Sequence, residues 1–184
     1  MSKVLVPLAQ GCEELEAVTI IDVLRRAGIQ VVSAGLDERP VTGSRGTVLI
    51  PDTTLEHALR EEYDMVALPG GQPGTDNLDK DSRLKPFLAK MAAAQKFTAA
   101  ICAAPKVLAN AGLLKGKRAT AFPGTLEKLQ LHDVTLDAAP VVRDGLVITS
   151  RGPGTAMDFA LELVEILAGK SKRLEVENGL QRPH

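Results

Sequence analysis

The feature that most constrains this chain is the alternation of short apolar runs with longer segments of helical periodicity. Apolar runs lie at residues 4–8, 31–34, 65–68 and 98–101, and amphipathic segments alternate with them. Runs of this length are typical of buried strands, whereas apolar residues three and four positions apart are typical of helices. Because strands that alternate with helices favour a parallel sheet covered on both faces, we expect an α/β fold.

The remaining elements are predicted from the same periods and from capping and breaking residues. Helices are expected at residues 14–27, 105–111 and 155–167, and a further strand at residues 118–121. Residues 41–50 are expected to form either a pair of strands or an irregular excursion at the sheet edge. The charged tail after Gly169 is expected to form either a short surface helix or an arm that contacts a partner.

Three local signals mark turns and helix starts. Thr53 and Glu56 have the spacing of a capping box, which predicts a short helix. Asp81 or Ser82 is expected to cap the helix that follows. The dipeptide Asp144-Gly145 lies between two apolar runs and predicts a two-residue hairpin.

Composition excludes several classes of partner. The chain has 184 residues, with 22 Lys and Arg against 23 Asp and Glu, so its formal net charge is −1. A near-neutral chain without a basic cluster predicts no specific nucleic-acid site and no attraction to an anionic membrane. Its apolar stretches are shorter than the roughly 20 residues that a membrane-spanning helix needs. Residues 4–9 are also shorter than the apolar core of a signal peptide, so we expect a cytoplasmic location.

Cysteine and histidine are scarce, with two and three residues respectively. Two cysteines are too few for a disulfide framework or a four-thiolate zinc site, and no pair of histidines has metal-ligand spacing. We therefore expect no metal and no cofactor. Cys12 is expected to be a structural or incidental thiol, and His57 and His184 are expected to be solvated.

The most informative motif is Ala99-Ala100-Ile101-Cys102-Ala103-Ala104-Pro105, in which a predicted strand ends at a cysteine between small residues and a helix begins. Small neighbours are required at a sharp turn such as the nucleophile elbow of hydrolases. The turn is expected to place the Cys102 sulfur at the carboxyl end of the sheet and beside the positive end of a helix dipole, which favours the thiolate. The alternative is a buried small residue in an alanine-rich turn.

Two further segments are candidates to meet Cys102. Residues 68–71 (LPGG) end the preceding strand, and one of their N–H groups can pair with that of Ala103 as an oxyanion hole. The alternative is a plain strand terminator. Glu13 and Glu16 follow the first strand and are either ordinary partners of a helix dipole or carboxyls that reach the same crevice. An ionised glutamate would oppose the thiolate, a protonated one can donate a hydrogen bond to sulfur, and the two groups would titrate together.

In combination and order, these motifs resemble the Parkinson disease protein 7 family within the ThiJ/PfpI superfamily, and more closely its bacterial YajL-like branch. The resemblance runs through nearly the whole chain. It is carried by Gly11-x-Glu13-Glu14-x-Glu16 and by residues 22–28 (DVLRRAG), 44–46 (SRG), 68–71 (LPGG), 99–105 (AAICAAP) and 149–155 (TSRGPGT).

The resemblance implies a flavodoxin-like three-layer sandwich that forms a homodimer. Residues 1–184 would form one ThiJ/PfpI domain, of the class I glutamine amidotransferase-like type. It also implies that Cys102 is the reactive, oxidation-prone thiol and that Glu16 is a protonated carboxyl facing it. The other implied site residues supply oxyanion-binding amides (Gly71 and Ala103) or bind a substrate or anion (Gly70, Arg45 and Arg151).

Two positions distinguish this chain from related branches. Phe122 stands where animal members of the family carry a histidine near the cysteine, and a phenyl ring cannot transfer a proton. Ala103 stands where the protease branch carries a histidine directly after the cysteine, which argues against a peptidase. Glu16 would therefore have to act as both acid and base.

The resemblance implies a cysteine-dependent deglycase or glyoxalase III-type enzyme as the leading hypothesis. Its substrates would be methylglyoxal or glyoxal and their early adducts on proteins and nucleotides, so that it protects against carbonyl and oxidative stress. The alternative is a non-enzymatic redox-responsive sensor or chaperone that uses the same oxidisable Cys102. Phe122 favours the alternative, because the loss of a base harms catalysis more than it harms oxidation.

Overall fold

A seven-stranded sheet forms the centre of the computed structural model, which describes residues 1–182. In spatial order its strands are β10 (Val141–Asp144), β11 (Val147–Ser150), β7 (Phe97–Ile101), β6 (Met65–Leu68), β1 (Lys3–Leu8), β2 (Gln30–Gly35) and β5 (Thr53–Thr54). The edge strand β10 runs antiparallel to β11, and the other neighbouring pairs are parallel. The predicted, mostly parallel α/β sheet is confirmed.

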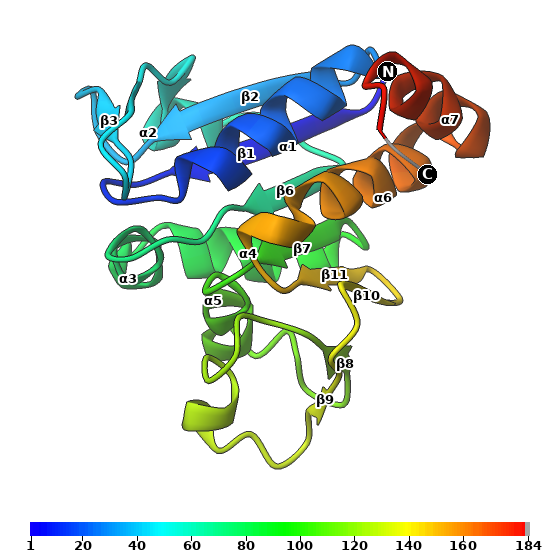
Figure 1. Ribbon diagram of the computed structural model, residues 1–184. Coiled ribbons are helices and arrows are strands. Elements are labelled where there is room, and N and C mark those ends of the chain that lie inside the picture. The colour runs from blue at the N-terminus through cyan, green and yellow to red at the C-terminus, as the bar shows by residue number, and fades with distance from the viewer. Residues whose placement is uncertain (183–184) are drawn as a thin grey trace.

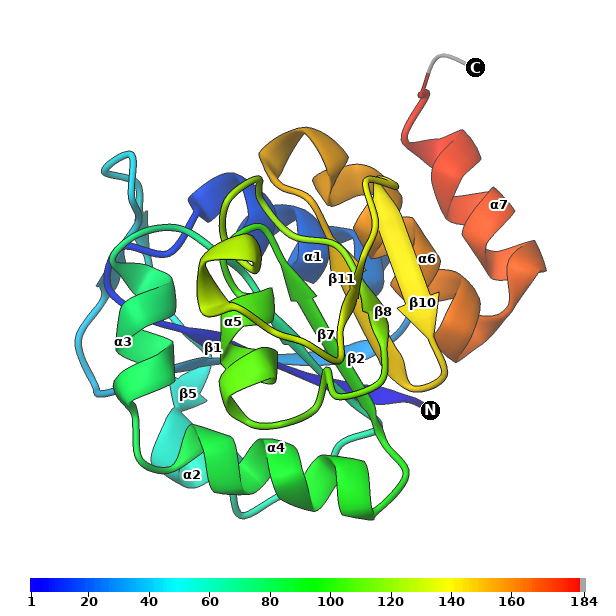
Figure 2. The same cartoon turned by 90° about the horizontal axis from the view of Figure 1, so that it is seen from below.

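Helices cover both faces of this sheet (Figure 1 and Figure 2). One face carries α1 (Glu14–Arg26) and α6 (Ala156–Ala168), and the other carries α2 (Leu55–Ala58), α3 (Gly74–Lys80), α4 (Leu84–Ala93) and α5 (Pro105–Asn110). Successive side chains of a strand point to opposite faces, so Val4 and Val6 pack under α1 and α6 while Leu5 packs against the other layer. The expected flavodoxin-like three-layer sandwich is confirmed.

The carboxyl ends of β1, β6 and β7 lie side by side, because these three strands are parallel neighbours. From β1 the chain passes to β2 on one side, and it returns later to β6 on the other side. Such a reversal of strand order opens a crevice at the carboxyl ends of the strands, which is where open α/β sheets bind ligands. The fold therefore brings the turns after these three strands to one place.

Two small sheets lie outside the central one. Strands β3 (Val41–Thr42) and β4 (Val48–Leu49) are antiparallel, which confirms the pair of strands among the two alternatives for residues 41–50. Strand β8 (Arg118–Ala119) is shorter than predicted and pairs with β9 (Thr135–Leu136), which was not predicted. Within residues 1–182 the chain also forms two 3₁₀ turns, η1 (Glu127–Leu129) and η2 (Pro153–Thr155).

Three local predictions need correction. Thr54 rather than Thr53 caps α2, because its hydroxyl accepts the His57 N–H. Neither Asp81 nor Ser82 is the N-cap of α4, which is Arg83; the Asp81 carboxylate instead accepts the N–H of Arg83 at 2.9 Å. The hairpin loop is also shifted by one residue, because Asp144 still pairs with Val147.

The charged tail forms helix α7 (Lys170–Gly179), which packs against α6. Val176 is buried in the core, and Arg173 forms an ion pair with Glu165 of α6 at 2.7 Å. The short surface helix, one of the two alternatives, is therefore confirmed. The prediction for His184 lies outside the described residues. Within residues 1–182 no helix combines the length and apolar character needed to cross a membrane.

Two phenylalanines offer a matched test of this core. Phe159 on α6 is fully buried, whereas Phe122 is 51% exposed. We expect Phe159→Ala to lower the free energy of unfolding by about 3–5 kcal/mol, because it leaves a cavity between α6 and the sheet. Phe122→Ala should change it by less than about 1 kcal/mol. Urea unfolding followed by circular dichroism measures both, and equal losses would contradict the packing described.

Candidate active site

Cys102 lies in the turn directly after β7 and has a backbone φ of +63°. This left-handed conformation is strained for a residue that carries a Cβ. Two backbone hydrogen bonds hold it: the Cys102 N–H donates to the Ser150 carbonyl at 3.0 Å, and the Phe122 N–H donates to the Cys102 carbonyl at 2.8 Å. The predicted sharp turn is therefore present, at the carboxyl edge of the sheet.

Glycines bring the turn after β6 against Cys102. A Cβ on Gly70 would lie 2.7 Å from the Cys102 Cβ and 2.9 Å from the Ile101 carbonyl oxygen, so a larger residue does not fit. Gly71 has a φ of +91°, which glycine adopts without strain. The N–H groups of Gly71 and Ala103 lie close enough to the Cys102 sulfur to oppose the rise in the pKa of its thiol. The two predicted oxyanion-binding amides thus lie beside the thiol.

Glu16 lies in the first turn of α1 and is fully buried. One carboxyl oxygen accepts the Gly70 N–H at 2.8 Å, the other is buried and has no hydrogen-bond partner among the described residues, and the carboxyl faces the Cys102 thiol. Burial raises the pKa of Glu16 to about 7, although the Gly70 N–H and the thiol oppose the shift. The carboxyl can therefore carry a proton at neutral pH, as the family resemblance implies.

The thiol does not have the lowered pKa that the helix dipole predicted. Burial raises the pKa of Cys102 to about 12, the charge of Glu16 adds to the shift, and the N–H groups of Gly71 and Ala103 oppose it. Two acids in contact release their protons in steps that belong to the pair. Between about pH 7 and pH 12 the pair therefore holds one proton.

A cleft of about 690 Å³ opens over the thiol. Its lining comes from the turns after β1, β6 and β7, from the β3–β4 hairpin, from α5 and η2, and from the segment after β8: Glu13, Ser44, Arg45, Gln72, Cys102, Lys106, Phe122, Pro123, Thr125, Lys128, Leu129 and Pro153, with Gly71, Ala103 and Gly124. Arg45 therefore lies at the predicted site. Arg151 does not line the cleft, and its guanidinium donates to the Ala138 carbonyl at 3.2 Å.

Other side chains near the cleft take roles that the sequence left open or did not indicate. Of the two candidate carboxyls, Glu16 reaches the thiol, while Glu13 lines the cleft and accepts the Ser44 hydroxyl at 3.0 Å. Lys106 forms an ion pair with Asp76 at 2.5 Å. Lys106 was not predicted as a site residue, although its position four residues after Cys102 could have indicated that it lies near the thiol. Cys12 is fully buried and does not line the cleft.

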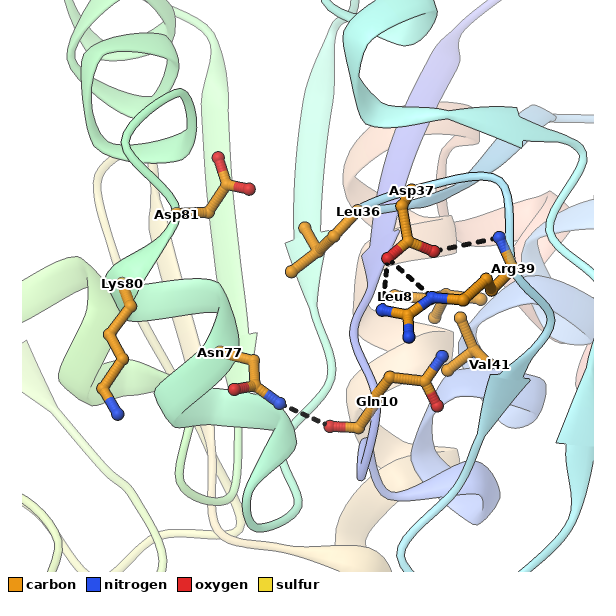
Figure 3. Close-up of a pocket in the computed structure, with 9 residues that line it drawn as sticks. All are labelled: Leu8, Gln10, Leu36, Asp37, Arg39, Val41, Asn77, Lys80 and Asp81. Atoms are coloured by element: carbon orange, nitrogen blue, oxygen red, sulfur yellow. Dashed lines mark hydrogen bonds and ion pairs between the residues drawn. The ribbon is translucent and has the colours of Figure 1, made fainter.

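A second cleft, of about 340 Å³, lies between the turns after β1 and β2 and helix α3 (Figure 3). Its acids are each held by an arginine, Asp37 by Arg39 and Asp81 by Arg83, at 2.6 Å in both cases. It contains none of the predicted site residues. Within residues 1–182, no three His, Cys, Asp or Glu side chains are grouped as a metal site requires.

Comparison with known proteins agrees with this geometry. A model of the DJ-1/PfpI family matches residues 2–166. The chain belongs to the DJ-1/PfpI family. A Danio rerio relative, "Parkinson disease protein 7 homolog", is 43% identical over 178 residues, which are 95% of this chain and 94% of the relative.

Two further members of the DJ-1/PfpI family show how widely the similarity extends. The Caenorhabditis elegans "Glutathione-independent glyoxalase DJR-1.2" is 34% identical over 174 residues, covering 95% of this chain and 90% of the relative. The crystal structure of Drosophila melanogaster DJ-1beta superposes with a TM-score of 0.94 at 44% identity and covers 100% of both chains. The predicted superfamily is thus confirmed over nearly the full chain.

The raised pKa of Glu16 predicts how stability depends on pH. Because the folded state binds this proton more tightly than the unfolded chain, its stabilising effect is present below about pH 4.5 and is lost as pH rises to about 7. We expect the unfolding free energy of wild type relative to Glu16→Gln to fall by on the order of 3 kcal/mol over this interval. Urea unfolding at several pH values measures it, with the exposed Glu38→Gln as control. A difference that does not vary with pH would contradict the buried, protonated carboxyl.

Proposed function

We propose that this chain is a cysteine-dependent enzyme of the glyoxalase III or deglycase type. The observation that carries the proposal is the contact of one thiol with a buried carboxyl and two backbone N–H donors, Cys102 with Glu16, Gly71 and Ala103. These are the parts that nucleophilic attack on a carbonyl requires: a nucleophile, a proton acceptor and an oxyanion site. The relative named as a glutathione-independent glyoxalase supports the same chemistry.

The proposed reaction starts with proton transfer from the Cys102 thiol to Glu16. The sulfur then attacks the aldehyde carbon of methylglyoxal, and the N–H groups of Gly71 and Ala103 stabilise the oxyanion. After Glu16 protonates this oxygen, its carboxylate takes the proton from the same carbon and returns one to the neighbouring carbon, while the hydroxyl proton on the first carbon moves to the carbonyl oxygen of the neighbouring carbon. The hemithioacetal becomes a thioester, and water hydrolyses it to a hydroxy acid and the free thiol. The overall conversion of methylglyoxal and water to a hydroxy acid needs no external oxidant or cofactor.

Because the Phe122 ring cannot transfer a proton, Glu16 carries out the proton transfers of the proposed reaction. The ring lines the cleft where animal relatives place a histidine, so no imidazole is available at that position. From the combination and order of its motifs, we propose that the chain belongs to a bacterial YajL-like branch. Glyoxal and early adducts on protein and nucleotide groups are proposed as further substrates, since the cleft is larger than a three-carbon aldehyde needs.

We also propose that the protein is a cytoplasmic homodimer. On the outer face of α1, Leu15 and Val18 are 50% and 47% exposed and lie one helical turn apart. Exposed apolar side chains on one helix face are typical of a surface that another chain covers.

The second candidate function is a redox-responsive sensor or chaperone. It is favoured by the two N–H donors that already face the sulfur, since they would equally stabilise the oxygens of a sulfenate or sulfinate on Cys102. Mass spectrometry after mild peroxide treatment tests it. Resistance of Cys102 to sulfinic oxidation in the resting protein would count against a sensor.

The enzyme proposal predicts that Cys102→Ser abolishes methylglyoxal consumption. Glu16→Gln should reduce kcat by about 10²-fold or more, because a general acid and base is lost. Cys12→Ser is the matched control and should keep wild-type turnover, because that thiol does not reach the cleft. The rate of lactate formation measures all three. Full turnover by Cys102→Ser would refute the mechanism.

A further inference from the structure

The turn of the β3–β4 hairpin, residues 43–47, is fastened to the start of α1 by a single carboxylate. Glu14 accepts the Arg45 N–H at 2.9 Å and the Thr47 N–H at 3.1 Å, both at the same oxygen. Its other oxygen lies 3.3 Å from the Ser44 hydroxyl. The mechanism above assigns no role to this buried glutamate.

The turn and the carboxylate fit each other closely. A Cβ on Gly43 would lie 2.5 Å from the Glu14 carboxyl carbon, so a larger residue would force the turn and the carboxylate apart. The Gly43 N–H donates to Thr47 across the turn at 2.8 Å, and the Ser44 N–H donates to the Cys12 carbonyl at 2.7 Å. The position of the hairpin tip is therefore set by the segment that also begins α1.

The carboxylate stays charged under working conditions. Burial opposes ionisation of Glu14, but the N–H groups of Glu14 itself, Thr47 and Arg45, with the Ser44 hydroxyl, outweigh it and lower its pKa to about 2. Hydrogen bonds to an ionised acceptor are about twice as strong as neutral ones. The tip is thus held by charge-assisted bonds at neutral pH.

The tip carries a cation to the mouth of the Cys102 cleft. Ser44 and Arg45 both line that cleft. Arg45 forms no ion pair within the described part of the chain, so its charge is available to a reactant. By contrast, the Lys106 ammonium on the same cleft is neutralised by Asp76.

We propose that Glu14 is a positioning residue that holds Arg45 at the mouth of the cleft and so sets the preference of Cys102 for anionic reactants. The inference rests on the proposed role of Cys102 as the reactive thiol, but not on any particular substrate. Glu14 does not touch the reactant; it acts through the backbone of the residue that does.

The test compares two alkylating reagents that differ in charge. Iodoacetate and iodoacetamide both transfer their carbon to the Cys102 sulfur with loss of iodide, and only the first is an anion. Peptide mass spectrometry gives the rate at Cys102 separately from that at Cys12. At low ionic strength, a unit cation within about a nanometre should change the ratio of the two rates by about twofold.

Gly43→Ala is the decisive variant, because it forces the turn and the Glu14 carboxylate apart without changing any charge. We expect it to lower the iodoacetate to iodoacetamide ratio by about twofold, as Arg45→Ala does. The double variant should show no further fall, because both changes act through one residue. Gly179→Ala, which has open space around its Cβ and lies on α7, is the matched control and should keep the wild-type ratio.

Glu14→Gln is the second variant, for the case in which Gly43→Ala does not fold. Loss of the negative charge of Glu14 would by itself raise the iodoacetate to iodoacetamide ratio, because it removes a charge that repels the anion. Release of Arg45 lowers the same ratio, because the cation moves away from the cleft. We therefore expect Glu14→Gln to raise the ratio more in an Arg45→Ala background than in wild type. Asp52→Asn is the control for the loss of one negative charge. The Asp52 carboxylate accepts hydrogen bonds from Ser33 and Arg25 and does not line the Cys102 cleft.

Each outcome decides between the explanations. A wild-type ratio in Gly43→Ala beside a lowered ratio in Arg45→Ala would overturn the role of Glu14. A wild-type ratio in Arg45→Ala would overturn the role of Arg45 and with it the inference. Absence of alkylation at Cys102 with either reagent would instead refute the reactive thiol on which the proposed function depends.

Discussion

The site depends on the contact between a buried carboxyl, Glu16, and a buried thiol, Cys102. The carboxyl joins the turns after two neighbouring strands, since it accepts the Gly70 N–H and faces the thiol. Two acids in contact, both shielded from water, do not ionise together at neutral pH. The fold thereby keeps one proton where sulfur and oxygen can exchange it, without a histidine.

The arrangement explains why small residues surround the thiol. Gly70 allows the turn after β6 to touch the Cβ of Cys102, and the left-handed conformation of Cys102 turns its backbone out of the strand. The adjacent N–H groups then face the sulfur. The same two N–H donors can stabilise an oxyanion on the attacked carbon or an oxygen added to the sulfur. Catalysis and oxidation of Cys102 would therefore use the same donors.

The sequence predicted the parts of this structure that follow from strong local patterns. Buried strands such as β6, the elbow at Cys102 and the three-layer sandwich follow from apolar runs, small residues and family motifs. Helix α3 was missed because residues 74–80 carry one apolar side chain, Leu78, which packs only in the folded chain. The raised pKa of the thiol was missed because desolvation depends on tertiary burial, which opposes the helix dipole. Arg151 was assigned by family likeness alone, and the fold directs it away from the cleft.

The pH dependence of Cys102 alkylation by neutral iodoacetamide tests the shared proton most directly. If Glu16 can accept the proton of the thiol, a fraction of the molecules carries the thiolate as soon as the pair loses its first proton. The account therefore predicts a first rise in rate with a midpoint at about pH 7, a plateau to at least pH 10 and a further rise near pH 12 as the pair loses its second proton. A rate that stays low through neutral pH and rises in a single step above pH 10 would contradict it, because the thiol would then titrate without help from the carboxyl.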